Sequence, residues 1–164
     1  MAATDCSVPH GGLEIPFERP AIRAAMGAYT ETFELRTKGD GHVTDISDRV
    51  GAALARSSVR SGIATVFTPS STAAIVANEN EAGLLDDLRD LLSRVAPAGV
   101  EYVHHRTWGE RNGHSHLRAM LLGPSVVFPV SEGRPALGRW QQILFIELDT
   151  HARDRTVRVD VVGE

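Results

Sequence analysis

Hydrophobic and polar residues alternate along several short stretches of this chain. Residues 28–37 place Tyr29, Phe33 and Leu35 on one side of an extended strand, with polar residues on the other side. Residues 155–163 alternate in the same way. Alternation of this kind is typical of strands with one buried face. We expect six more strands, at residues 62–68, 72–78, 99–105, 116–122, 125–130 and 139–149.

Two other stretches have the spacing of amphipathic helices. In residues 44–57, Ile46, Val50 and Leu54 lie four positions apart, and Thr44 or Asp45 can cap the start. From Glu81 onward, a leucine-rich stripe recurs every three or four residues as far as Val95. Asn80 can cap this second helix, and Pro97 and Gly99 end it.

The pattern therefore predicts an α+β fold in which mostly antiparallel, sandwich-like sheets are combined with two main helices. Residues 1–27 are rich in proline and glycine and show no sustained period, so we interpret them as an N-terminal extension. Residues 28–164 form a single domain, as their number suggests. Pro129 indicates that the strand at 125–130 lies at an edge or carries a bulge.

Composition and charge narrow the class of partner. The net charge is −4 and the aromatic content is 5%, so nucleic acid is not an expected ligand. No apolar run is long enough for a membrane span, and the start lacks a signal-peptide pattern, which favours a cytoplasmic protein. Cys6 is the single cysteine, and a disulfide framework is excluded. No glycine-rich phosphate loop is present, so no organic cofactor is evident.

Four of the seven histidines fall within residues 104–116. If residues 113–117 are extended, His114 and His116 point to the same side and converge on one ion. His104 and His105 are adjacent, so only one of them can join that site. The histidines are candidate metal ligands for Zn²⁺ or Mg²⁺, or candidate acid–base groups. The alternative is that some are exposed loop histidines.

Two carboxylates are further candidates for chemistry. Glu79 lies between an apolar strand and the second helix, where it serves either as a catalytic acid–base group or only as a complement to the helix dipole. Glu147 interrupts an apolar strand, and a carboxylate there needs a partner or a raised pKa. The alternative for Glu147 is a position near the strand end, or at an interface, that faces water.

Arginines flank these segments. Arg118 and Arg139 are candidate phosphate-binding groups, because a guanidinium suits planar recognition of anions. For each of them, a role as ordinary surface charge is the competing interpretation.

Three motifs together resemble the YjbQ-type family, to which secondary thiamine-phosphate synthase activity has been attributed. They are TAAIVANENE, YVHH followed by HSHLRAMLLGPS, and PVSEGRPALGRWQQILFIELD, and the resemblance covers residues 29–162. The resemblance implies a small α+β protein that assembles as a homotrimer. It also implies a site lined by histidines and acidic residues, which is compatible with a divalent metal, and weak joining of a pyrimidine diphosphate to a thiazole phosphate.

The family pattern is carried over residue by residue. Two of its histidines match His104 and His116, and its NEN motif and late glutamate match Asn78–Asn80 and Glu147. The remaining histidine of the family pattern precedes the TAA segment, and Ser70 occupies its position here. Arg139 stands where the family usually has a threonine. His114 would then replace the missing imidazole, which gives a metal set of His104, His114 and His116. His105 is the alternative to His114 in that set. Asn78, Ser70, Arg118 and Arg139 would hold a phosphate-bearing ligand.

Two functional hypotheses follow. In the first, His116, His104, Glu79 and Glu147 catalyse a reaction of small phosphate-bearing molecules, such as thiamine-phosphate formation. In the second, the chain is a non-catalytic trimeric module that binds a metal ion or a small anion. The absence of an imidazole at Ser70 favours the second hypothesis, and the lack of an Asp-rich magnesium–diphosphate motif weighs against a dedicated synthase.

Overall fold

The structure is a computed structural model that describes residues 27–164. The predicted extension and Cys6 therefore lie outside the described residues, apart from Gly27, which begins the first strand. Within the described range no helix is both long and apolar enough to cross a membrane.

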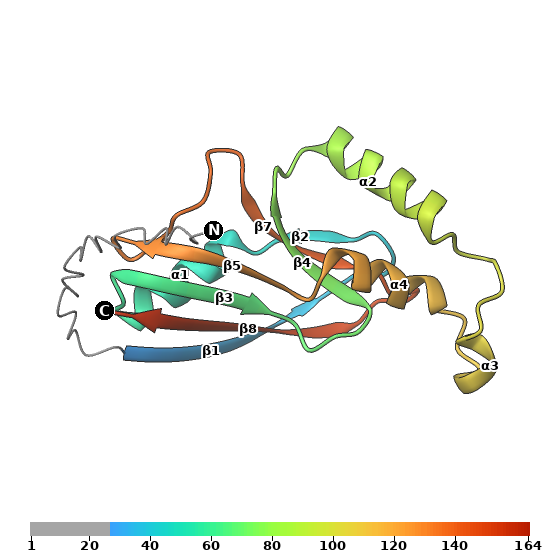
Figure 1. Ribbon diagram of the computed structural model, residues 1–164, viewed down its shortest axis with the longest axis horizontal. Helices are drawn as coiled ribbons and strands as arrows, with labels where there is room; N and C mark the ends of the chain where they lie inside the picture. Colours follow the sequence, from blue (N-terminus) through green and yellow to red (C-terminus); the bar gives the residue numbers. More distant parts are fainter. Residues whose placement is uncertain (1–26) are drawn as a thin grey trace, which may run out of the picture.

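Two antiparallel sheets form the body of the molecule (Figure 1). Sheet A has the strand order β1 (Gly27–Arg36), β8 (Asp154–Gly163), β3 (Ser61–Phe67), β5 (Ser125–Ser131) and β6 (Arg134–Pro135). Sheet B has the order β2 (Val43–Asp45), β7 (Gln142–Glu147) and β4 (Ala73–Asn78). The predicted α+β class with mostly antiparallel sheets is confirmed.

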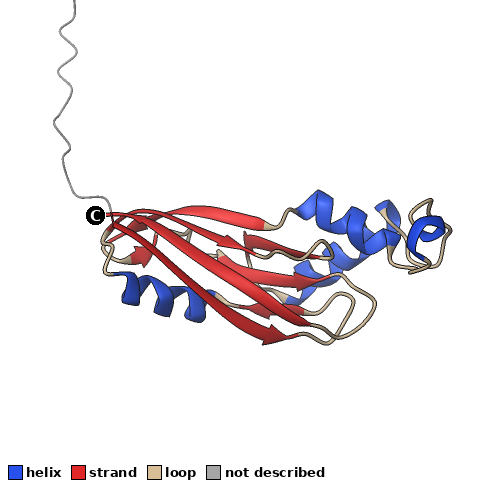
Figure 2. Ribbon diagram, turned by 90° about the horizontal axis from the view of Figure 1, so that it is seen from below, coloured by secondary structure: helices blue, strands red, loops and turns tan. Residues whose placement is uncertain are grey.

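Four helices accompany these sheets: α1 (Ser47–Ser57), α2 (Ala82–Val95), α3 (His105–Trp108) and α4 (Gly113–Leu122). Figure 2 shows α1 beside one end of the strands, with the other helices gathered at the opposite end. Both predicted helices are present. Glu81 caps α2 in place of the predicted Asn80, because its carboxylate accepts the N–H groups of Gly83 and Leu84, each at 2.8 Å.

The main core lies between the two sheets and α1. It includes Val157, Val159 and Val161 of β8, all fully buried, on the face that alternation predicted. Strand β7 is central in sheet B and is buried on both faces. Phe145 contributes to the main core, and Ile146 joins a second cluster that α2 and α4 cover. Burial on both faces explains why β7 is continuously apolar rather than alternating.

Two predicted strands are wrong. Residues 99–105 form turns that lead into the short helix α3, and residues 116–122 belong to helix α4. Six of the seven residues at 116–122, all except His116, are strong helix formers, and none of the seven is β-branched. The apolar run at 116–122 was too short to distinguish a strand from a buried helix by period alone.

Candidate functional site

The rings of His104 and His116 lie in contact, with their centroids 4.6 Å apart and their planes tilted by 60°. His104 occupies the N-cap position of α3, and His116 lies in the first turn of α4. Burial lowers the pKa of His116, and the neighbouring His104 lowers it further because two positive imidazoles repel each other. This pair is the part of the predicted histidine cluster that the fold assembles.

The side of α4 that carries His116 also carries two polar atoms without partners. Asn112, Ser115 and His116 are spaced i, i+3 and i+4, so they share one face of the helix. The Oδ1 atom of Asn112 and the Oγ atom of Ser115 are buried and accept or donate no hydrogen bond within the described part of the chain. Buried polar atoms normally have partners, so these two oxygens are open to a bound water molecule or ligand. Thr44 Oγ1, Thr68 Oγ1 and His114 Nε2 are likewise buried without a partner in the described residues.

His114 does not join this face. In a helix, residues two positions apart point in nearly opposite directions, so the strand-based argument for convergence of His114 and His116 was wrong. The side chain of His114 is buried near Arg118 and Asp40, and burial lowers its pKa, as does the charge of Arg118. The Nε2 atom of His114 is buried and has no hydrogen-bond partner among residues 27–164. The alternative ligand His105 is engaged, because its Nε2 accepts the N–H of Gly113 at 3.2 Å.

Arg118 is a structural residue rather than a free anion-binding group. Its side chain is only 8% exposed. The guanidinium donates to the carbonyl oxygen of Ala96 at 3.0 Å and to the carboxylate of Asp40 at 3.0 Å. These contacts connect α4 to the loop after α2 and to the turn after β1. The Arg118 guanidinium is therefore engaged within the protein.

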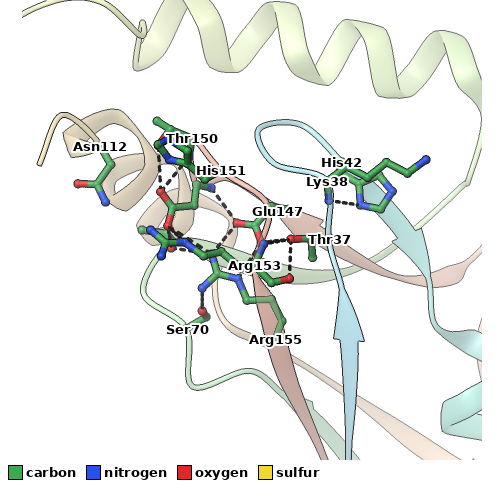
Figure 3. A network of polar contacts seen from close by, with 12 residues as sticks. Thr37, Lys38, His42, Ser70, Asn112, Glu147, Thr150, His151, Arg153 and Arg155 are labelled. Carbon is green, nitrogen blue, oxygen red and sulfur yellow. Dashed lines mark hydrogen bonds and ion pairs between the residues drawn. The ribbon is translucent and has the colours of Figure 1, made fainter.

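Glu147 is fully buried at the end of β7 and every contact it makes is internal (Figure 3). Arg155 donates to both of its oxygens, at 2.6 and 2.7 Å. The hydroxyl of Thr37 and the N–H of Asp149 donate to it as well, at 2.7 and 2.8 Å. A carboxylate held by four donors has no free lone pair directed at a substrate, so the geometry assigns Glu147 a positioning role.

Arg155 links this buried pair to Ser70. Its guanidinium donates to the Ser70 hydroxyl and, at 2.9 Å, to the hydroxyl of Thr72 (Figure 3). The backbone of the next residue, Ser71, lies near the ring of His116 and acts to raise its pKa. Ser70 thus lies beside the histidine pair, but its hydroxyl serves Arg155.

Asp149 is one of two carboxylates, with Glu110, whose charge acts on His116. It is 3% exposed and lines a hollow of about 180 Å³ together with Arg153. Burial acts to raise its pKa, but the N–H of Thr150 and the guanidinium of Arg153, 2.9 Å away, hold the pKa below its ordinary value. The rest of the lining consists of Glu110, Arg111, Asn112, Thr150 and His151.

The remaining predicted site residues lie at the other end of sheet B. In the β4–β7 register, Ala73 is opposite Glu147, whereas Asn78 is opposite Gln142. Five strand steps separate these pairs, a distance of roughly 17 Å. Glu79 follows Asn78 there, and Arg139 precedes β7 and stacks on Trp140, 4.8 Å from the ring centroid. Asn78, Glu79 and Arg139 therefore do not reach the histidine pair within one chain.

A metal site of three protein ligands is not assembled by residues 27–164. No group of three His, Cys, Asp or Glu side chains in that range lies close enough together to hold an ion. His104 and His116 offer two nitrogens, and His114 belongs to another face of α4. A single chain thus provides fewer ligands than the three or four that a zinc site uses.

Sequence reasoning missed Asn112, Ser115, Asp149 and Arg153. Asp149 follows Glu147 by two residues, so both point to the same side of an extended chain, and that parity was the available signal. Asn112 and Ser115 had no such signal in the sequence. They stand out only because their oxygen atoms are buried without partners in the folded chain from residue 27 onward.

Comparison with known proteins identifies the family. The family described as UPF0047 protein YjbQ-like matches residues 31–164. A UPF0047 protein of Methanothermobacter thermautotrophicus is 42% identical over 139 residues, which is 85% of this chain and 95% of the relative. Another, from Archaeoglobus fulgidus, is 43% identical over 115 residues, covering 70% and 87%.

Solved structures agree with this match. A YbjQ-like protein of unknown function from Sulfolobus solfataricus superposes with a TM-score of 0.79 at 34% identity, covering 85% of this chain and 99% of that one. A hypothetical protein from Aeropyrum pernix gives 0.76 at 34% identity, covering 83% and 99%. The fold, the matched range and the sequence identity together show that this chain belongs to the YjbQ-like UPF0047 family.

Proposed function

We propose that the chain binds a small phosphate-bearing anion beside the His104–His116 pair. The observation that carries this proposal is the face of α4 on which His116 lies with two buried, unpartnered polar atoms, Asn112 Oδ1 and Ser115 Oγ. The hydroxyl of a hydrogenphosphate would donate to Asn112 Oδ1, and its oxygens would accept from the Ser115 hydroxyl. Imidazolium and guanidinium groups form the strong, charge-assisted hydrogen bonds that phosphate oxygens accept.

The adjoining hollow has no net charge of its own, so the charge of the histidine pair determines whether an anion is attracted. Arg111 and Arg153 are matched there by Glu110 and Asp149. The net attraction for an anion therefore depends on whether the imidazole pair carries a proton. Because the pKa of His116 lies below its ordinary value of 6.5, binding of an anion would have to bring a proton with it near neutral pH.

Replacing His116 by asparagine is expected to weaken sulfate and inorganic phosphate binding roughly 10- to 100-fold, because a hydrogen bond to a charged group contributes about 1.5–3 kcal/mol. Sulfate affinity of the wild type should rise as the pH is lowered from about 7.5 to about 5.5, since a falling pH increases the protonated fraction of His116. Isothermal titration calorimetry at several pH values measures both effects. Sulfate keeps its charge over this range, so any change in its affinity reports protonation of the protein. Sulfate has no hydroxyl to donate to Asn112 Oδ1, so hydrogenphosphate is the probe of that contact.

The control is His42→Asn, a histidine outside the site whose Nδ1 accepts the N–H of Lys38 (Figure 3). This variant should keep the wild-type affinity and pH profile. Equal affinity in the wild type and the His116 variant, or an affinity that does not change with pH, would contradict the proposal.

A divalent metal is the competing occupant of the same place. We favour the anion because one chain offers two nitrogen ligands, and because the nearby Asp149 carboxylate already binds Arg153 and Thr150. Metal analysis of the purified protein separates the two ideas. One tightly held zinc ion per chain that is lost in the His116 variant would favour the metal.

Thiamine-phosphate formation is a second candidate for this site. The observation in its favour is the contact between two imidazoles, since a pair of this kind can donate and accept protons during group transfer. Incubation with the pyrimidine diphosphate and the thiazole phosphate is the assay. If product forms with the wild type and not with His116→Asn, the site is catalytic and does not only bind an anion.

We also propose that the chain assembles as a homotrimer, as the family resemblance implies. The outer face of sheet A supports this, because Ile63, Val127 and Val162 are 56%, 60% and 42% exposed on neighbouring strands. Apolar patches of this kind mark interaction surfaces. Light scattering is expected to give about three times the chain mass of 17.7 kDa, and Ile63→Glu should reduce that mass. A monomeric wild type would refute the assembly.

A further inference from the structure

Helix α2 lies over sheet B without covering it closely. Leu92 is the only buried residue of its 14. Leu84, Leu91 and Val95 remain 37%, 51% and 58% exposed, although they belong to the apolar stripe that should face the protein. A helix with this much uncovered stripe leaves apolar space at its inner side.

That space is a cavity of about 200 Å³ between α2 and β4 and β7. Its walls are apolar side chains of the strands, namely Val76, Leu144 and Ile146, and of the helix, namely Leu84, Leu85, Leu88 and Leu91. It lies at the end of sheet B away from the histidine pair, since Asn78 and Glu79 are part of its lining. The cavity is therefore distinct from the proposed anion site.

The polar lining of the cavity is acidic. Glu79 and Asp87 contribute carboxylates, and neither forms an ion pair with any residue of the described chain. Residues 79–90 contain five carboxylates and one arginine. That arginine, Arg89, is already engaged by Asp86 and by the carbonyl oxygen of Gly41. The surroundings thus favour a cation.

We propose that this cavity binds a small organic cation with an apolar body and an ammonium group. The body fits between the leucines of α2 and sheet B, and the ammonium lies at the Glu79 and Asp87 carboxylates. A cavity of about 150 Å³ accommodates benzene, so this one takes an apolar body of roughly six to eight carbon atoms. The opposite charge of the ligand separates this site from the anion site at the other end of the sheet.

The test compares three probes of similar shape: 2-phenylethylamine, 2-phenylethanol and phenylacetate. Amide shifts of residues in β4 and α2, followed by ¹⁵N–¹H NMR titration of the full chain, report binding at the cavity. We expect the amine to bind about five times more tightly than the alcohol, the ratio that one partly exposed ion pair provides. Phenylacetate should bind most weakly.

Two variants separate charge from shape. The double variant E79Q/D87N should abolish the preference for the amine while leaving alcohol binding unchanged. The matched control, D86N/D90N, removes two charges from the same helix outside this cavity and should keep the preference. Leu91→Ala, at an exposed wall position, should weaken all three probes about equally.

The proposal is overturned if none of the probes shifts β4 and α2 amides at millimolar concentration. It is also overturned if amine and alcohol bind the wild type equally, or if D86N/D90N removes the preference as fully as E79Q/D87N. The anion-binding proposal is not touched by any of these results.

Discussion

Replacing Arg155 by methionine is expected to lower the free energy of unfolding by about 3–5 kcal/mol, because it leaves the Glu147 carboxylate buried without its charge partner. Glu147 is 0% exposed at the side chain and Arg155 is 11% exposed, so solvent cannot replace the guanidinium. The hydroxyls of Ser70 and Thr72 would lose a donor at the same time. For a chain of 164 residues, the melting temperature should fall by roughly 10 °C.

Urea unfolding at a fixed protein concentration measures this effect, since assembly would otherwise change the apparent stability. The control is Arg158→Met, on the same strand. Arg158 forms an exposed ion pair with Asp160 at 2.7 Å, and its loss should cost less than about 1 kcal/mol. The double variant E147L/R155M should recover part of the lost stability, because it removes the buried charge together with its partner. Equal losses for Arg155→Met and Arg158→Met would disprove the structural role of the pair.

Gly62→Ala is expected to cost about 3 kcal/mol through a clash between backbones. Gly62 of β3 is opposite Gly163 of β8, and a Cβ atom at Gly62 would lie 2.1 Å from the carbonyl oxygen of Val162. No rotamer change relieves a contact with backbone, so the two central strands of sheet A would have to separate locally. Chemical unfolding monitored by circular dichroism gives the stability difference.

Gly51→Ala is the matched control for this prediction. Gly51 lies inside α1, and a Cβ atom there would meet nothing within 4 Å. The control should stabilise the protein by about 0.5–1 kcal/mol, because alanine restricts the unfolded chain and favours the helix. If Gly62→Ala were as well tolerated as Gly51→Ala, the close approach of β3 and β8 would be refuted.

The buried Glu147–Arg155 pair also gives the candidate site its rigidity. Arg155 connects the end of β7 to the loop of Ser70 and Thr72, and the adjacent Ser71 contacts the ring of His116. Charged groups that are fully hydrogen-bonded in a buried network hold one arrangement. We therefore interpret Glu147 and Arg155 as the support on which the histidine pair is positioned, and His104, His116, Asn112 and Ser115 as the groups that would meet a ligand.

The sequence by itself determined much of the fold. Regular alternation located β1 and β8 and their buried faces, and four-residue spacing located α1 and α2. The apolar run before Glu147 located β7, which proved to be the central strand of its sheet. These features are local, because the period of side chains along a strand or helix reports directly which of its faces is buried.

Only the tertiary structure decided the arrangement of the site. The expected strand around His116 is the helix α4. In a helix, His114 and His116 point to different sides, whereas Asn112 and Ser115 lie on the side of His116. The fold pairs Glu147 with Thr37, 110 residues away, and with Arg155. Glu79 and Arg139 lie at the end of sheet B that is away from the histidine pair. The reason is physical: the partner of a buried charge is set by segments that meet only after folding, and the local period carries no information about them.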